Sequence, residues 1–420
     1  MTTLPAVVLD NGTGYTKIGY AGNVEPSYLI PSLIAVEGKA DLSKCPKNTE
    51  DFDFFIGAEA ENAPKAYQKT FPLKHGLIEN WTLMEMYWEQ AIFKYLRCDP
   101  EDHYFLLTEP PMNPPENREY LAEVFFESFN VPGMYIAVQA VLAIVASWSG
   151  KDQKKEGASQ SLTGTVIDSG DGVTHVIPVA DGYVIGSSIK HIPLAGKDIT
   201  SFIQQLLVER GEPIPADERM NMARMIKEKY AFVSKDITKE FGIMESGKDE
   251  KGISTFKQHE AIDPISKKKY TFDVGYEQFL APELFFNPEI FSSDFTTPLA
   301  AIVDDVVQSC PIDCRRSLYS NIVLSGGSTM FNGFGQRLQR DVKRFTDYRY
   351  EKAVEFAQGR FVPQKTDVKV VKYNYQRYAV WYGGSVMAGL PVFTNFCHSK
   401  AEYEEKGPAV CRYNHVFMGC

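Results

Sequence analysis

"VVLDNGTGYTKIGYAG", residues 7–22, places an aspartate and two glycines in a tight turn between two short apolar runs. A second stretch, "TVIDSGDGVTHVIPVADGY", residues 165–183, repeats this pattern. In each copy an apolar run ends in aspartate and continues as Asp-x-Gly-x-Gly, from Asp10 and again from Asp168. The second aspartate lies 158 residues after the first, which indicates a duplication at domain scale rather than a solenoid repeat. We therefore expect two related strand–turn–strand units.

The two turns have the composition of an anion-binding site. Their glycines permit positive φ and let a ligand approach the backbone, and successive N–H groups can form a nest for an anion. Lys17 follows the first turn and can supply a positive charge for a phosphate. The carboxylates of Asp10 and Asp168 would repel each other unless a cation lay between them, and Mg²⁺ suits such a place. We hypothesise that the two hairpins face each other and hold one polyphosphate, with Mg²⁺ bound to both aspartates through water. The alternative is that both are ordinary Asp-Gly hairpin turns.

A third glycine turn, "LSGGSTM", spans residues 324–330 and leads into an expected helix. The free N–H groups of a helix N-terminus favour a phosphate or ribose. By itself the same pattern also fits a simple strand-to-helix connection, so both interpretations stay open.

Composition excludes several classes of protein. The chain has 420 residues and a net charge of −10, and it contains no basic tract that would favour nucleic acid or an anionic membrane. The N-terminus does not resemble a signal peptide. The longest apolar stretch, residues 135–148, is too short to span a membrane, and we expect it to be a buried helix. The seven cysteines show no zinc spacing and are expected to be reduced cytosolic thiols, including Cys310 and Cys314.

Helical and strand patterns alternate along the chain, which predicts an α/β protein. Apolar residues at three-and-four spacing predict helices, whereas apolar runs stopped by proline or glycine predict buried strands. "NPPENREYL" is expected to begin a helix capped by Asn113, and "AVWYGGSVMAGLP", residues 379–391, is expected to be a strand, a glycine pair and the start of a helix. The other expected helices cover residues 81–96, 196–210 and 217–233.

The order of motifs resembles the actin family. The matching segments include both hairpins, "AVQAVLAIVAS", "IPLAGKDIT", "MIKEKYAFV", "IVLSGGSTMFNGF" and "YAVWYGGSVMAG", and they extend from Val7 to Gly389. The resemblance implies a duplicated actin-like (ribonuclease H-like) α/β fold with two lobes around a nucleotide cleft and four subdomains. The first lobe would comprise residues 1–150 and 375–420, with a small subdomain inserted at about 33–73. The second would comprise residues 151–374, with a small subdomain at about 195–282.

The resemblance also implies ATP and Mg²⁺ as cofactors and a set of site residues. Gln139 and His175 match the residues that position the attacking water. The first phosphate loop would comprise Asp10, Gly12, Thr13, Gly14, Tyr15 and Lys17, and the second Asp168, Gly170, Asp171, Gly172 and Val173. The nucleoside side would comprise Arg224, Lys227, Glu228, Gly326, Gly327, Ser328, Met330, Phe331 and Arg377.

The sequence departs from that of conventional actin in several segments, and we therefore expect a more specific role. Residues 39–53, 149–160 and 345–370 look like insertions, and the segment that engages the next subunit in actin has a different sequence. Head-to-tail assembly of identical subunits needs both contact faces. Because the face that contains this segment is altered, self-assembly becomes doubtful, while contact through the opposite face is retained. The pattern resembles the family branch that pairs with a second actin-related protein in a seven-subunit complex nucleating branched actin filaments. That branch implies partners among actin filaments and nucleation-promoting factors, and a cytoplasmic, cytoskeletal location. A slow ATPase activity would then act as a timer of this process rather than as a metabolic reaction.

Four alternatives remain at this stage. A conventional filament-forming actin and a chromatin-associated actin-related protein share the fold. A small-molecule kinase would need an acceptor pocket, and the sequence contains no distinct acceptor motif. A chaperone ATPase would need a peptide-binding domain, for which the 31 residues after Gly389 leave no room.

Overall fold

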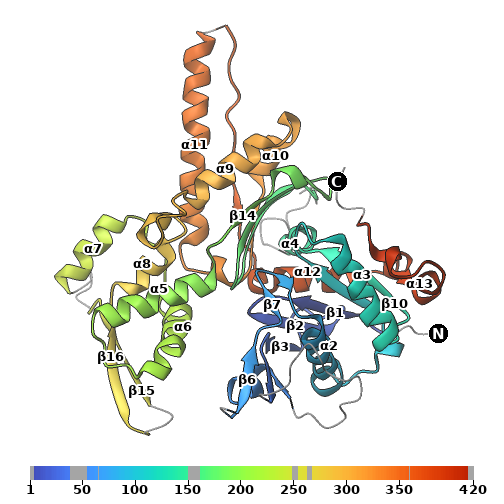
Figure 1. The fold of residues 1–420 in the computed structure, drawn as a ribbon. Helices are drawn as coiled ribbons and strands as arrows, with labels where there is room; N and C mark the ends of the chain where they lie inside the picture. The colour runs from blue at the N-terminus through green and yellow to red at the C-terminus, as the bar shows by residue number, and fades with distance from the viewer. Residues whose placement is uncertain are drawn as a thin grey trace.

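A computed structural model describes residues 4–37, 54–64, 66–149, 161–247, 254–262, 267–358 and 360–414. Two mixed sheets, each covered by helices, form the body of the molecule (Figure 1). None of the helices in these ranges is long and apolar enough to cross a membrane. The expected insertion at residues 39–53 and all but Ser149 of that at 149–160 lie outside the described residues.

The first sheet is built around strands that are buried on both faces. Its strand order is β19-β10-β9-β1-β2-β3, in which β1 pairs antiparallel with β2 and parallel with β9. All residues of β1 and β9 are buried, which explains their continuous apolar runs. The strands are β1 (Val7–Asn11), β2 (Tyr15–Tyr20), β3 (Tyr28–Pro31), β9 (Phe105–Glu109), β10 (Gly133–Val138) and β19 (His398–Ser399).

The second sheet repeats the pairing pattern of the first. Its order is β13-β12-β11-β17-β18, with β14 also paired to β12; β11 is antiparallel to β12 and parallel to β17. In β1–β2 Asp10 is opposite Lys17, and in β11–β12 Asp168 is opposite His175. The duplication is therefore present in the register as well as in the sequence. The strands are β11 (Gly164–Ser169), β12 (Thr174–Ala180), β13 (Tyr183–Val184), β14 (Lys190–Ile192), β17 (Ile322–Ser325) and β18 (Val370–Val371).

Three small sheets lie outside the two main ones. The order β5-β4-β6 forms one, and β7–β8 and β15–β16 are antiparallel pairs. The β15–β16 ribbon lies beyond α5 and α6 at one end of the molecule (Figure 1). The strands are β4 (Ile34–Glu37), β5 (Phe55–Ile56), β6 (Tyr67–Thr70), β7 (Leu73–Lys74), β8 (Leu77–Ile78), β15 (Lys257–Ile262) and β16 (Lys269–Val274).

Helices cover the sheets and join them. Helix α2 continues as a π-helical segment to Leu96. In the first half the helices are α1 (Gly57–Glu61), α2 (Trp81–Glu89), α3 (Pro115–Glu123) and α4 (Gln139–Ser147). The second half contains α5 (Gly196–Glu209), α6 (Arg219–Lys229), α7 (Ile237–Ser246), α8 (Glu277–Glu283), α9 (Leu299–Ser309), α10 (Ile312–Ser320) and α11 (Phe334–Ala357). The chain then returns to the first sheet with α12 (Ala379–Ala388) and α13 (Lys400–Lys406).

Two helices connect the halves. Small apolar residues of α4 pack in one core cluster with β11, β12 and β17 of the second sheet, while Leu142 of α4 packs with Val8 and Trp381 in the first-sheet cluster. Helix α12 packs directly on α4, and the indole N–H of Trp381 donates to the Val8 carbonyl at 3.0 Å. The α4–α12 pair is therefore the main packed junction between the two sheets.

Three expectations about elements were wrong. The apolar stretch 135–148 is not one helix, because it divides into the end of β10 and helix α4. Residues 379–388 form the helix α12 without a preceding strand. The N-cap of α3 is Pro114 rather than Asn113, whose side-chain amide instead donates to Glu109 at 3.1 Å.

The third expected insertion forms part of a projecting arm. Helix α11 runs from Phe334 to Ala357 and extends away from the body, and the following segment returns alongside it (Figure 1). Lys365 on the returning segment pairs with Asp347 of α11 at 3.1 Å. Part of helix α11 and the returning segment are thus the residues that the sequence analysis expects to be an insertion.

Candidate functional site

A cavity of about 630 Å³ lies between the two main sheets. Residues from β1, β2, β11, β12 and the turn after β17 line it, together with residues of α4, α6 and α12. Its volume is within the range of sites that enclose a cofactor-sized ligand.

The first hairpin presents Asp10 and Lys17 to this cavity. Its turn is closed by the Gly12 N–H, which donates to the Tyr15 carbonyl at 3.2 Å, and by the Ser32 hydroxyl, which donates to the Gly12 carbonyl at 2.7 Å. Lys17 Nζ donates to Asp10 Oδ2 at 2.8 Å. This ion pair follows from the register, which places the two residues opposite each other on adjacent strands.

The second hairpin is held by two neighbouring elements. Its turn closes from the Gly170 N–H to the Val173 carbonyl at 3.4 Å. The Gly170 carbonyl accepts from the Ser328 hydroxyl at 2.6 Å and from the Gly196 N–H, at the start of α5, at 3.1 Å. The third glycine turn is therefore bonded directly to the second hairpin, and the three segments form one surface.

The two hairpin turns both line the cavity and contact each other. A Cβ added to Gly14 would lie 2.8 Å from the Asp171 Cβ, and one added to Gly172 would lie 2.8 Å from the Thr13 Cγ2. The contact is reciprocal, because each turn brings a glycine to a side chain of the other. Both glycines are needed here for close approach rather than for an unusual φ.

A further loop bridges the two turns. The His75 ring Nδ1 donates to the Gly172 carbonyl at 3.1 Å, and the neighbouring Gly76 N–H donates to the Thr13 hydroxyl at 2.9 Å. The loop between β7 and β8 thus contacts both halves beside the cavity.

Most of the predicted site residues line the cavity together. These are Asp10, Gly12, Thr13, Gly14, Tyr15, Lys17, Gln139, Asp168, Gly170, Asp171, Gly172, Val173, His175, Lys227, Glu228, Gly326, Gly327, Ser328, Met330, Phe331 and Arg377. Arg224 is the exception, since it is outside the lining and its Nη1 lies 3.5 Å from Glu61 Oε1 on the other half.

Sequence reasoning missed a second group of lining residues. Asn11 and Ser325 adjoin predicted residues, and that position was the only signal available for them. Leu29 lies in β3 and Gly76 and Pro110 lie in loops, and none of the three carries a local signal. The rest of the missed lining consists of Lys229, Ala231, Asn332, Tyr378, Ala379 and Val380.

Gln139 and His175 stand beside the two aspartates. Gln139, the first residue of α4, has its Nε2 3.5 Å from both Asp10 Oδ1 and the Thr108 hydroxyl, which itself donates to Asp10 at 2.7 Å. Burial, with a smaller contribution from the charge of nearby His191, lowers the pKa of His175 to about 3. The imidazole is therefore neutral at physiological pH and presents one donor and one acceptor nitrogen.

The carboxylates lining the cavity are suited to a cation. Burial raises the pKa of Asp168, and the negative charge of Asp10 raises it further, while Ser325 and Lys17 act in the opposite direction. A cation near both carboxylates would relieve this repulsion, and oxygen donors are those that Mg²⁺ prefers. No cluster of three or more acidic, histidine or cysteine side chains that could hold a metal occurs among the described residues.

Comparisons with known proteins show the family of this chain. A family model described as actin matches residues 1–415. The chain belongs to the actin family. Proteins titled "Actin-related protein 3" from Dictyostelium discoideum and Acanthamoeba castellanii are each 60% identical to it, and one from Caenorhabditis elegans is 55% identical. Each alignment covers 99% of this chain and 98% of the relative.

Membership of the actin family accounts for the duplicated sheets. The two mixed sheets with the same pairing pattern, joined through α4 and α12, are the actin-family architecture that the motif order implied. The match also extends through the arm formed by α11.

Proposed function

We propose that this actin-family chain binds ATP with Mg²⁺ in the cavity between its two main sheets. The observation that carries the proposal is the reciprocal contact of the two glycine turns, with Lys17, Asp10 and Asp168 beside them. Backbone N–H groups of the turns would bind phosphate oxygens, and the Lys17 ammonium would neutralise part of their charge. The cation, held near Asp10 and Asp168, would supply electrostatic stabilisation of the triphosphate.

The opposite end of the cavity would hold the nucleoside. Lys227 Nζ donates to the Gly196 carbonyl at 2.8 Å, and Lys227 and Glu228 both line the cavity. Met330, Phe331 and Arg377 complete that wall. A planar base would pack on the apolar side chains while the charged groups interact with the sugar.

Gln139 and His175 would orient a water molecule. The neutral His175 imidazole can accept a hydrogen bond from water at one nitrogen, and the Gln139 amide can donate or accept. We propose nucleotide binding as the primary role and slow hydrolysis as secondary, because no described residue beside Gln139 is a strong base.

We further propose that the chain is a structural subunit of an assembly that nucleates branched actin filaments. The support is the 55–60% identity, over nearly full length, to proteins titled "Actin-related protein 3". In that role it would lie beside a second actin-related protein in a seven-subunit complex and imitate an actin subunit of the daughter filament. Its partners would be actin filaments and nucleation-promoting factors, and its location the cortical actin cytoskeleton.

A two-part experiment tests both proposals. Lys17→Ala should weaken Mg-ATP binding, measured by isothermal titration calorimetry, by about tenfold or more, because a charge-assisted phosphate contact is lost. Lys197→Ala is the matched control, since its side chain is exposed and outside the cavity lining. The assembled complex containing Lys17→Ala should also nucleate pyrene-actin more slowly. Unchanged ATP binding and nucleation would show that the site is assigned wrongly.

Native co-purification and mass spectrometry distinguish the assembly role from its alternatives. Recovery with a second actin-related protein supports the nucleator, whereas recovery with chromatin-remodelling subunits supports the chromatin alternative. Pelleting of the isolated chain in polymerising salt would favour a conventional actin. An ATP turnover rate that rises on addition of a sugar would favour a kinase.

A further inference from the structure

The aspartates of the two hairpins each receive a hydrogen bond from the neighbouring parallel strand. In the first sheet, the Thr108 hydroxyl of β9 donates to Asp10 Oδ1 at 2.7 Å. In the second sheet, the Ser325 hydroxyl of β17 donates to Asp168. Both donors are buried, with 7% of Thr108 and 1% of Ser325 exposed. Each carboxylate is therefore held by a side chain from outside its own hairpin.

The two hydroxyls occupy equivalent places in the duplicated sheets. Strand β9 is the parallel neighbour of β1, and β17 is the parallel neighbour of β11. In β11–β17 the aspartate and the serine are directly opposite each other. In β1–β9 Leu9 is opposite Leu107, and Asp10 and Thr108 are the next residues along. Since residues at matching positions of paired strands lie on the same face of the sheet, the hydroxyl reaches the carboxylate in both halves. The duplication thus includes these donors as well as the turns.

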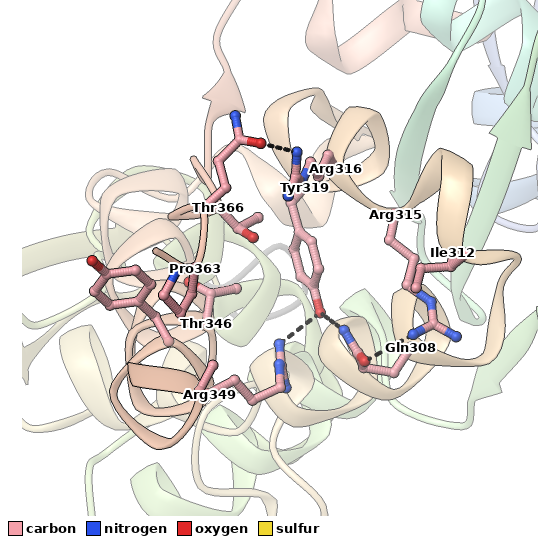
Figure 2. A pocket seen from close by; sticks show the side chains of 12 residues that line it. Gln308, Ile312, Arg315, Arg316, Tyr319, Thr346, Arg349, Pro363 and Thr366 are labelled. Carbon is pink, nitrogen blue, oxygen red and sulfur yellow. Dashed lines mark hydrogen bonds between the residues drawn. The ribbon is translucent and has the colours of Figure 1, made fainter. Parts of the chain in front are cut away.

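A buried carboxylate elsewhere in the chain is held in a different way. Beside α11 lies a second cavity of about 210 Å³, lined in part by Tyr319 and Arg349, which are hydrogen-bonded to each other (Figure 2). Both also bind Asp304: the tyrosine hydroxyl donates to it at 2.7 Å, and the guanidinium contacts it through two nitrogens at 2.6 and 2.5 Å. The arginine supplies a full positive charge, so the protein itself neutralises this carboxylate.

The hairpin aspartates have less positive charge beside them. No ion pair to Asp168 occurs among the described residues, and Lys17 Nζ instead lies 2.8 Å from Asp10 Oδ2. When both carboxylates are ionised, one ammonium group cannot neutralise the two of them. Their hydroxyl donors fix the positions of the oxygens without cancelling the charge, which is what a site for an added cation requires.

We propose that Thr108 and Ser325 are a matched pair of positioning residues, which hold the Asp10 and Asp168 carboxylates in the orientation that one Mg²⁺ ion and its water ligands require. The proposal rests on the binding of Mg-ATP proposed above. Mg²⁺ demands near-ideal octahedral geometry, so a rotation of either carboxylate would misplace an oxygen. The hydroxyls would act through the carboxylates and would not contact the ion.

The Mg²⁺ dependence of nucleotide binding by the full chain tests the proposal. Titration of a fluorescent ATP analogue in EDTA, and then at increasing Mg²⁺ concentrations, separates affinity for the nucleotide from affinity for the ion. Thr108→Val removes the hydroxyl with little change of shape, and Ser325→Ala removes the other one. Each should weaken the apparent Mg²⁺ affinity about tenfold or more. Neither should change the metal-free affinity by more than about twofold, because the hydroxyls bond the carboxylates rather than the phosphates.

One variant restores the donor and another serves as the matched control. Thr108→Ser keeps a hydroxyl and should stay within about twofold of the wild-type Mg²⁺ affinity. Tyr319→Phe removes the hydroxyl donor of the buried Asp304, outside the cavity between the sheets. It should lower the melting temperature and leave the Mg²⁺ affinity within about twofold of wild type, because the two sites share no residue.

The outcomes separate this inference from the proposed function. Absence of Mg²⁺-dependent binding by the wild type would overturn the proposed function itself. If the wild type binds Mg-ATP and either hydroxyl-free variant keeps the wild-type Mg²⁺ affinity, the matched pair is wrong, and a lower melting temperature alone would show a structural role. A Thr108→Ser variant as weak as Thr108→Val would also overturn it, since shape and not the hydroxyl would then matter.

Melting temperatures identify a variant that fails to fold. If Thr108→Val does so, Thr108→Cys takes its place, because a thiol of similar size is a weaker donor than a hydroxyl. Its Mg²⁺ affinity should be about threefold or more below that of the wild type, and an unchanged affinity would overturn the proposal.

Discussion

At the residue scale, the two hairpins share a backbone plan and differ in charge. The position opposite the aspartate is Lys17 in the first hairpin and His175 in the second. The lysine forms an ion pair with its aspartate, whereas burial keeps the histidine neutral. One pairing geometry therefore supplies a fixed positive charge on one side of the cavity and a neutral hydrogen-bonding group on the other.

His175 gives a prediction about pH. In the unfolded chain a histidine binds a proton below about pH 6.5, while in the folded chain His175 does so only near pH 3. Because the unfolded state binds more protons between these values, His175 contributes a loss of stability as the pH falls from about 6.5 toward 3. Chemical denaturation should show that His175→Gln loses less stability than the wild type between pH 7 and pH 5. In the wild type, NMR of the His175 ring should show a neutral imidazole at pH 5. A charged ring at that pH would contradict the assignment.

The third glycine turn gives a prediction about a pair of neighbouring residues. Gly326 has φ of +90°, and a Cβ there would lie 2.2 Å from the Ser169 carbonyl oxygen. Gly326→Ala should therefore reduce the free energy of unfolding by about 2 kcal/mol or more. Gly327→Ala is the control, since a Cβ at Gly327 meets nothing within 4 Å. Thermal denaturation of both variants checks this, and equal stability would mean that the turn can rearrange.

At the element scale, the junction between α4 and α12 explains the glycine pair that the sequence analysis placed between a strand and the start of a helix. Gly383 and Gly384 are both buried within α12, where glycine is ordinarily unfavourable. At Gly383 an added Cβ would lie 2.0 Å from the Leu142 carbonyl oxygen, so the two helices can approach closely only with glycine there. The pair serves helix packing rather than a loop.

Replacement of this glycine tests the junction. Gly383→Ala should destabilise the chain by about 3 kcal/mol, because the helices must move apart. Gly242→Ala in α7 provides the matched control, since its Cβ would meet nothing within 4 Å and alanine there should stabilise the helix by about 0.5–1 kcal/mol. Melting temperatures measured by circular dichroism should change in opposite directions for the two variants. An unchanged melting temperature of Gly383→Ala would mean that α12 can shift without a loss of stability.

At the scale of the whole molecule, polar contacts between described residues join the two halves outside the packed junction of α4 and α12. His75 and Gly76 bond both turns, and Arg224 of α6 approaches Glu61 of α1 at 3.5 Å. If ATP binds both halves, its differential affinity would shift them toward the closed arrangement.

Arg224 distinguishes a nucleoside contact from a contact between the halves. Since both partners of its ion pair are exposed, the pair should contribute at most about 1 kcal/mol. Arg224→Ala should therefore change ATP affinity by less than about fivefold and increase the dissociation rate of a fluorescent ATP analogue. In 0.5 M salt, which screens the ion pair, the analogue should dissociate from the wild type as fast as from the variant. Glu61→Ala should reproduce the result. A loss comparable to that of Lys17→Ala, with no effect of Glu61→Ala, would instead support a direct nucleoside contact.

The sequence alone determined the duplication, because the Asp-x-Gly-x-Gly turns reflect local backbone requirements that recur wherever the same turn is built. It also placed Lys17 shortly after the first turn, whereas its position opposite Asp10 came from the register of the structure. It could not separate β10 from α4 within residues 135–148, because a strand and a helix buried on all sides are equally apolar. Only the tertiary structure decided that Thr13 meets Gly172, that Gly76 and Pro110 reach the cavity, and that Thr108 and Ser325 hydrogen-bond the two aspartates. These contacts join residues distant in sequence, and local propensity carries no information about which distant surfaces will pack together.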